Sequence, residues 1–123
     1  MDTVSFLSVE TGKDLIVAFA LMIPEDPEEI RSLILHRCPM VESVLDRSER
    51  GVRVTLELED EDDDDPDMLD EVHWEAQTAI MRLKTRHKTY ELDLRKVDAS
   101  SISSMRKVLK KMNHDRIVRL SGI

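Results

Sequence analysis

The chain has 123 residues, a net charge of −8 and 41% hydrophobic residues, which predicts one domain able to bury a core without a structural metal. The single cysteine, Cys38, excludes an intrachain disulfide framework and favours a reducing compartment. Because the chain starts with Met-Asp-Thr and its longest apolar run has nine residues, we expect neither a secretory signal nor a membrane span, and a cytoplasmic protein.

The first elements predicted are two strands. Residues 4–9 have weak strand character, and Gly12 marks a turn after them. Residues 15–23 are continuously apolar and include β-branched side chains, and the run stops at Pro24. This pattern predicts a central strand buried on both faces, with a buried helix as the alternative.

A helix is predicted over about residues 27–37. Asp26 can cap it, and Pro27 suits its first position. The apolar residues Ile30, Leu33 and Ile34 then follow at helical spacing. The triplet 33–35 also fits a strand, so both interpretations stay open.

The next two features are a strand and an acidic stretch. Val52, Val54, Leu56 and Leu58 alternate with polar residues, which predicts a strand with one buried face. Seven consecutive acids, residues 59–65, follow it directly. Like charges at this density repel one another, so residues 59–67 are predicted to form a mobile acidic loop.

An antiparallel meander is predicted over residues 71–94. Three runs, 71–76, 79–84 and 88–94, each alternate between apolar and polar side chains, and a period of two places the apolar ones on one face of a sheet. A helix over 68–83 is the alternative, because several of its apolar residues also lie three or four positions apart.

The last elements are a helix over about residues 101–112 and an edge strand over 116–120. The helix has a cap at Asp98 or Ser100, an apolar stripe and a lysine-rich last turn. The sum is one α+β domain, 1–123: an antiparallel sheet of about five to seven strands, with helices 27–37 and 101–112 packed on one face.

The charge is divided unevenly along the chain. Residues 1–81 hold 22 acids and six bases, whereas residues 82–123 hold four acids and 12 bases. We therefore expect the acidic edge, 57–67, to bind a basic protein surface, because complementary charge accelerates such encounters. Its candidate partner-binding residues are Glu57, Glu59, Asp60, Glu61, Asp62, Asp63, Asp64, Asp65 and Asp67.

The basic part of the chain gives an alternative function. Phosphate contact needs positive charge on one face, which the hairpin 82–88 and the helix 101–112 could supply. In this alternative the acidic loop shields a nucleic-acid-contacting surface. The candidate phosphate-contacting residues are Arg82, Lys84, Arg86, Lys88, Lys107, Lys110 and Lys111.

No motif for catalysis, a metal or a cofactor is recognised, so we expect no enzyme, no catalytic or metal-binding residue and no cofactor. Three glycines are too few for a phosphate-binding or dinucleotide-binding loop, and the acidic stretch lacks the glycine of a calcium-binding loop. The four histidines do not share a metal-ligand spacing. On the predicted helix 27–37, moreover, His36 and Cys38 would face apart.

Segments 48–55 and 89–94 resemble parts of small bacterial domains of unassigned function, a resemblance that implies no activity and no site residue. The leading hypothesis is therefore a non-enzymatic bacterial interaction module of the inhibitor or immunity type. The alternatives are the nucleic-acid-contacting protein and a homo-oligomer whose acidic and basic halves meet.

Overall fold

A computed structural model describes residues 1–57 and 65–123, which form a mixed eight-stranded sheet, one α-helix and two short 3-10 helices. Along the sheet the strands follow the order β4-β3-β2-β1-β7-β6-β5-β8. The elements in chain order are β1 (Asp2–Thr11), β2 (Leu15–Ile23), β3 (Asp26–Arg37), η1 (Pro39–Val44), η2 (Arg47–Glu49), β4 (Arg53–Leu56), β5 (Leu69–Glu75), β6 (Ile80–Thr85), β7 (Thr89–Asp93), α1 (Ala99–Met112) and β8 (Arg119–Ser121).

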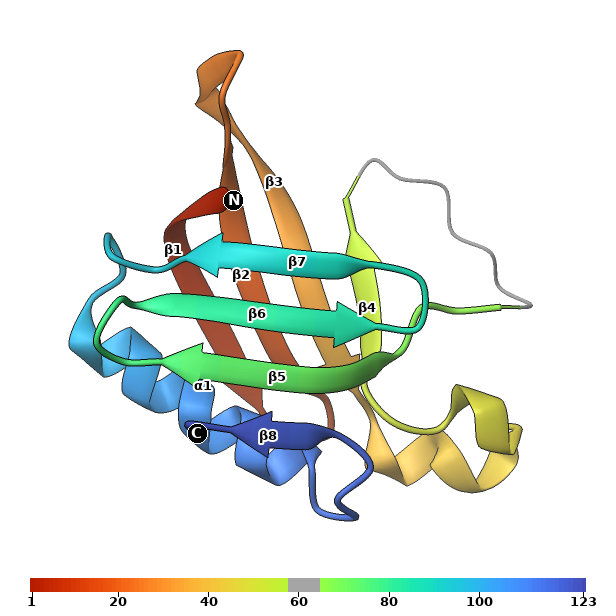
Figure 1. Ribbon diagram of the computed structural model, residues 1–123. Coiled ribbons are helices and arrows are strands. Elements are labelled where there is room, and N and C mark those ends of the chain that lie inside the picture. The colour runs from red at the N-terminus through yellow and green to blue at the C-terminus, as the bar shows by residue number, and fades with distance from the viewer. Residues whose placement is uncertain (58–64) are drawn as a thin grey trace.

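The sheet folds over on itself into two halves. Strands β1 to β4 pair antiparallel in one half, and β7, β6 and β5 pair antiparallel in the other, with β8 parallel to β5. A short parallel pairing of β1 with β7, at Asp2 and Leu92, joins the halves. Figure 1 shows strands β5 to β7 running across β1 to β4, so that the two halves face each other.

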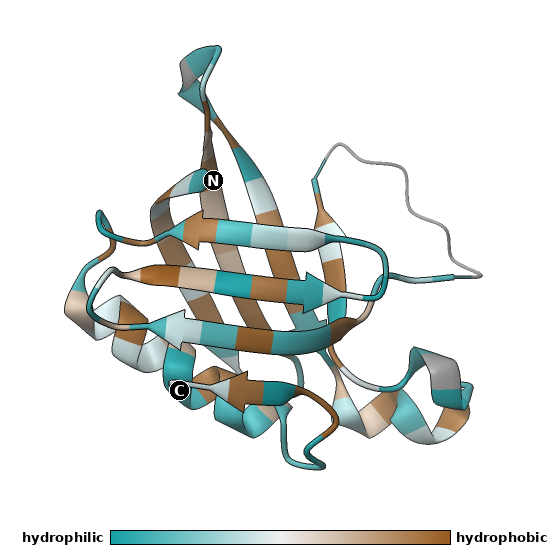
Figure 2. Ribbon diagram, viewed as in Figure 1, coloured by the Kyte–Doolittle hydropathy of each residue, from teal (hydrophilic) through white to brown (hydrophobic). Residues whose placement is uncertain are grey.

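The core lies between these two halves. Apolar side chains at alternate positions point inward, which gives β2 and β3 their buried residues Val17, Phe19, Leu33 and Leu35. The facing half contributes a matching set from its meander, and Figure 2 shows the alternation along its strands. That set is Val72, Trp74, Met81, Leu83, Tyr90 and Leu92.

Helix α1 adds one apolar side to this core. The Asp98 carboxylate accepts a hydrogen bond from the Ser101 backbone amide, which caps the helix start as the sequence predicts. Its buried residues, Met105, Val108, Leu109 and Met112, join the core, and the helix packs against β1 and β2. No helix among the described residues is long and apolar enough to cross a lipid bilayer.

A buried arginine ties the end of β3 to the end of α1. The Arg37 side chain is 1% exposed, and its guanidinium donates to Glu42 Oε2 at 2.9 Å and to Asp115 Oδ2 at 2.7 Å. It also donates to the Met112 carbonyl at 2.6 Å. These contacts raise the pKa of Arg37 and lower that of Glu42, and Arg37 lowers the pKa of Asp115 to about 2.

The predicted fold class is wrong in two respects. The described residues form eight strands in a mixed sheet rather than five to seven antiparallel strands, and they form one α-helix rather than two. The meander over 71–94, the helix over 101–112 and the strand over 15–23 are confirmed. The edge strand near 116–120 is also confirmed, as β8, although it runs parallel to its neighbour.

The helix predicted over 27–37 is strand β3. Asp26 serves the turn between β2 and β3, where its Oδ1 accepts a 3.3 Å hydrogen bond from the Glu28 backbone amide. Nine positions of β2 pair with β3, and β4 pairs with its other edge. These long-range pairings override the helical spacing of Ile30, Leu33 and Ile34, so the alternative strand interpretation of 33–35 is the correct one.

Candidate functional site

Three acids of the predicted acidic edge lie within the described residues, and each interacts inside the chain. Glu57 accepts a 3.0 Å hydrogen bond from the Ser32 backbone amide through Oε2. Asp67 accepts from the Thr85 hydroxyl at 2.8 Å and from the His87 amide at 3.0 Å. Asp65 Oδ2 lies 3.0 Å from His87 Nε2. The remaining predicted acids, Glu59, Asp60, Glu61, Asp62, Asp63 and Asp64, lie outside the described residues.

The end of the acidic stretch therefore lies against the turn between β6 and β7. Arg86 in that turn donates to the Pro66 carbonyl at 3.2 Å and to Asp65 Oδ1 at 3.4 Å. The alternative function, in which the acidic loop shields a nucleic-acid-contacting surface, requires such a contact. Residues 65–67 also contact β4, because the Val54 amide donates to the Asp67 carbonyl at 2.9 Å.

The basic candidates do not form one positive surface. Arg82 Nε donates to Glu91 Oε2 at 3.1 Å, and Lys84 pairs in register with Glu71. On the outer face of β5 to β8, positively and negatively charged side chains thus lie beside one another. The lysines of α1 (Lys107, Lys110 and Lys111) lie on another side of the molecule from the β6–β7 turn that holds Arg86 and Lys88, as Figure 1 shows.

Strand β3 brings together residues that the predicted helix would have separated. His36 lies in β3, and Cys38 follows the strand in extended conformation, so the two side chains face the same side. Asp14, directly before β2, interacts with both. His36 Nε2 lies 3.1 Å from Asp14 Oδ1, and a hydrogen bond to Asp14 raises the pKa of the Cys38 thiol. This pairing favours the protonated thiol, which is a poor nucleophile. In residues 1–57 and 65–123, no group of three or more side chains has the geometry of a metal site.

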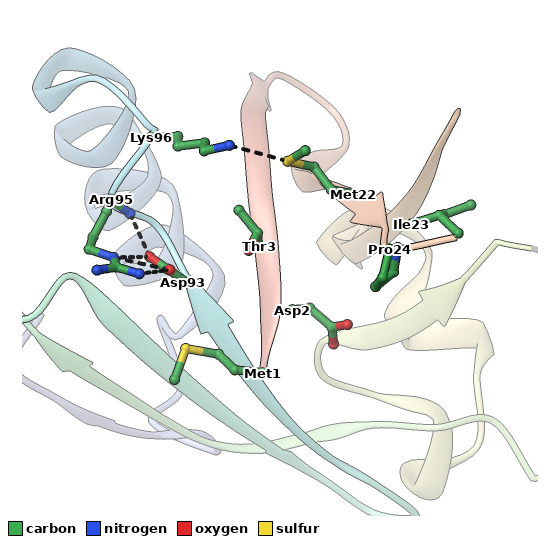
Figure 3. Close-up of a pocket in the computed structure, with 9 residues that line it drawn as sticks. All are labelled: Met1, Asp2, Thr3, Met22, Ile23, Pro24, Asp93, Arg95 and Lys96. Atoms are coloured by element: carbon green, nitrogen blue, oxygen red, sulfur yellow. Dashed lines mark hydrogen bonds and ion pairs between the residues drawn. The ribbon is translucent and has the colours of Figure 1, made fainter. Parts of the chain in front are cut away.

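A pocket of about 520 Å³ lies beside the junction of β1 and β7, and Figure 3 shows its lining side chains. Arg95 turns back onto Asp93, with Nη2 donating to Oδ2 at 2.7 Å, and this contact lowers the pKa of Asp93. Lys96 Nζ lies 3.7 Å from Met22 Sδ. Arg95, Asp93 and Lys96 thus contact their own neighbours, and we assign no ligand to this pocket.

The most distinctive surface is the side of β1, β2 and β3 that faces away from the core. Its side chains alternate with those of the core cluster; most of them are half-buried, and Ala20 is buried. Phe6 is 55% exposed and Ile30 is 42% exposed. We call this surface the apolar outer face and define it by Phe6, Ile16, Ala18, Ala20, Met22, Ile30 and Ile34.

The strand register places some of these side chains beside one another and places Ser8, Ser32 and His36 beside others. Ala18 of β2 pairs with Ile34 of β3, Met22 pairs with Ile30, and Ala20 lies between Phe6 and Ser32. This surface is absent from the sequence-based expectations, because the continuous apolar run 15–23 predicts a strand buried on both faces. A signal was present in β2, where the small Ala18 and Ala20 fall on one face and the large Phe19 and Leu21 on the other.

Comparisons of the chain with protein-family models, with curated proteins and with solved structures find no match.

Proposed function

We propose that this protein is a non-enzymatic protein-binding module that docks through the apolar outer face. The observation that carries the proposal is the group of apolar side chains on the outside of β1 to β3, in which Phe6 is 55% exposed and Ile30 is 42% exposed. Contiguous apolar patches of more than a few hundred Å² are rare on soluble monomers and mark interaction sites.

The physical reason is the hydrophobic effect. Covering apolar surface contributes about 25 cal/mol for each Å² removed from water. The strands beneath are paired along their length, so the face is rigid and its side chains lose little entropy when a partner covers them. A rigid apolar sheet face is a favourable docking surface for another sheet or for an apolar helix.

The acidic edge, 57–67, as the docking site for a basic partner stays a prediction. Its described members, Glu57, Asp65 and Asp67, already have partners within the chain. We therefore place the principal contact on the apolar outer face, and an inhibitor-type role remains one form that such binding would take. Nucleic-acid contact through Arg82 to Lys88 also stays a prediction, since acidic side chains interrupt that surface.

The test compares two substitutions that place the same side chain on the two outer faces. Ala18→Arg places a charge in the middle of the apolar outer face, whereas Thr89→Arg places it on the charged face of β7. Both sites are strand positions with side chains outside the core, so circular dichroism is expected to show the native fold for both.

The tagged wild-type protein and both variants are purified from the cells that naturally make the protein, and the bound proteins are quantified by mass spectrometry. We expect a bound protein, of this or another sequence, to be retained by wild type and by Thr89→Arg and to be lost by Ala18→Arg. Equal recovery with Ala18→Arg and Thr89→Arg would contradict the proposed docking face.

A further inference from the structure

We propose that the free edge of strand β1 pairs with the same edge of a second copy of this chain, so that the two sheets join into one. The free edge is the side of residues 6–11 that faces away from β2. Strand β1 pairs with β2 from Val4 to Thr11, whereas on its other side it pairs with β7 at Asp2 and Thr3. Such an edge contact goes beyond docking through the apolar outer face and does not depend on it.

The alternation of main-chain groups shows which residues point toward this edge. In an antiparallel ladder the N–H and C=O of one residue point to the same side, and those of the next residue point to the opposite side. The Ser32 carbonyl accepts a 2.9 Å hydrogen bond from the Glu57 amide, directly after β4, so Ser32 points to the β4 side. Leu33 therefore points toward β2, where it pairs with Phe19.

The same alternation continues across β2 into β1. Because Phe19 points toward β3, its neighbour Ala18 points toward β1, where it pairs with Ser8. The residues on either side of Ser8, Leu7 and Val9, then point their N–H and C=O groups away from β2. Among the described residues, neither forms a backbone hydrogen bond on that side. Unpaired main-chain groups in a row are a template for a further strand.

The two terminal strands of the sheet, β4 and β8, do not offer such an edge. The far side of β4 is occupied, because the Val54 amide donates to the Asp67 carbonyl at 2.9 Å. Strand β8 has three residues, and very short edge strands resist pairing. Strand β1 has a bulge between Val4 and Phe6, but residues 6–11 contain neither proline nor lysine, which commonly block an edge.

An antiparallel pair of two β1 strands satisfies these main-chain groups. A two-fold axis perpendicular to the sheet, between the two Ser8 residues, places Leu7 of each copy opposite Val9 of the other. Each of these two pairs exchanges two N–H···O bonds, so every free group of Leu7 and Val9 gains a partner. Helix α1 packs against β1 and β2 from the inner side, where its buried residues join the core, rather than beside β1 in the plane of the sheet.

The side chains of β1 suit this register. Leu7 lies in the core cluster and Val9 packs against it, so apolar side chains of the two copies lie side by side on the inner face. On the outer face, Phe6 of each copy, which is 55% exposed, lies opposite Glu10 of the other. Like charges directly opposite each other destabilise paired strands, and this register places none there.

The contact is short, so the dimer should be weak and reversible. Only residues 6–10 of each copy take part, which is less than a standard interface, and we expect a dissociation constant on the order of 100 μM or above. Each copy carries a net charge of −8, so salt should strengthen the dimer by screening the repulsion. A dimer in which acidic and basic halves meet should instead dissociate as salt is raised.

Disulfide cross-linking tests the register. In a Cys38→Ser background, Ser8→Cys places two thiols in a non-hydrogen-bonded pair with Cα atoms about 4.5 Å apart, which a disulfide can span. Glu10→Cys on the same face of β1 is the matched control, because its two Cα atoms would lie roughly 13 Å apart. Mild oxidation and non-reducing electrophoresis should show a covalent dimer for Ser8→Cys, and equal cross-linking of Glu10→Cys would overturn the proposed pairing.

A proline tests the main-chain bonds. Val9→Pro removes an N–H at the free edge and leaves the bonds between β1 and β2 in place, whereas Val9→Ala shortens the side chain and keeps the N–H. In the Ser8→Cys background, Val9→Pro should slow cross-linking by about tenfold or more and Val9→Ala by less than about threefold. Equal rates in two variants with native circular dichroism would contradict the pairing. If Val9→Pro does not fold, the comparison of Ser8→Cys with Glu10→Cys still decides.

Sedimentation velocity tests the unmodified protein over a dilution series that reaches about 1 mM, at low and at high salt. Wild type and Ala18→Arg should both form the dimer, because Ala18 points toward β2's partner strand and not toward the free edge. A wild-type protein that stays monomeric, together with a Ser8→Cys variant that does not cross-link, would overturn the dimer. The apolar outer face is judged separately, by the proteins that Ala18→Arg loses in cells.

Discussion

The two halves of the sheet share one core but present opposite outer faces. On β5 to β8, charged side chains lie beside side chains of opposite charge: Arg82 and Glu91 are 3.1 Å apart, and Arg119 and Glu71 are 3.3 Å apart. On β1 to β3, the corresponding positions carry apolar side chains such as Ala18, Met22 and Ile34 together with polar ones such as Ser8 and Ser32. Inward alternation is the same in both halves, so the difference lies only in what faces outward.

The two outer faces differ in how favourable their contact with water is. A charged outer face is stable in water without a cover, and its ion pairs contribute little because solvent screens them. An apolar outer face keeps an unfavourable contact with water until something covers it. The same fold thus contains one half with a charged outer face and one half with a partly apolar outer face, where we place the proposed docking site.

The largest expected effect concerns two arginines in very different environments, one buried and one exposed. Arg37→Met should lower the free energy of unfolding by about 3–5 kcal/mol, because Glu42 and Asp115 lose their shared buried cation. Arg82→Met on the charged face, where Arg82 is 58% exposed, should cost about 1 kcal/mol or less. Urea unfolding of both variants measures the difference, and equal costs would show that burial does not distinguish the two halves.

The next effect concerns the edge of the charged half. Gly122 has φ +77°, and a Cβ there would lie 2.0 Å from the Trp74 carbonyl oxygen. Gly122→Ala should therefore separate β8 from β5 and lower stability by about 2 kcal/mol. The matched control is Gly12→Ala, where a Cβ meets nothing within 4 Å. Faster amide exchange in β5 of Gly122→Ala alone would support the prediction, and equal exchange would contradict it.

A smaller effect is the acid sensitivity of the contact that holds β3 to α1. Arg37 lowers the pKa of Asp115 from 3.8 to about 2. A lowered folded-state pKa stabilises the protein above the ordinary pKa, and this stabilisation is lost as the pH falls from about 4 toward 2. Asp115→Asn should be less stable than wild type at neutral pH and should lose less stability over that range. Unfolding midpoints at several pH values test this, and parallel curves would exclude it.

The smallest effect is expected on the charged face itself. Glu91→Gln removes the exposed pair with Arg82 and should change stability by about 0.5 kcal/mol, with the difference vanishing at high salt. Thermal unfolding at two ionic strengths measures it. A loss above about 2 kcal/mol would mean that the charged face is a structural network rather than a solvated surface.

Part of the fold and little of the candidate site could be predicted from the sequence. The meander 71–94, the capped helix that ends near Met112 and strand β2 depend on local alternation, local capping and a short apolar run. Each of these signals lies within one element. Strand β3 carries local signals for both a helix and a strand. Asp26 and Pro27 resemble a helix start, whereas Leu33 and Leu35 alternate as in a strand. The pairing of β3 with β2 and β4 decided between the two.

The sequence by itself determined which side chains must be buried, because apolar residues at alternate positions cannot all remain in water. Only the tertiary structure decided how the strands meet: the parallel contact of Asp2 with Leu92, the closure of the sheet onto itself and the single helix beside it. It also decided that the second face of β2 lies outside the core cluster, with side chains that are half-buried or, at Ala20, buried. The physical reason is that burial depends on what lies across a face, and the chain that lies there is distant in sequence.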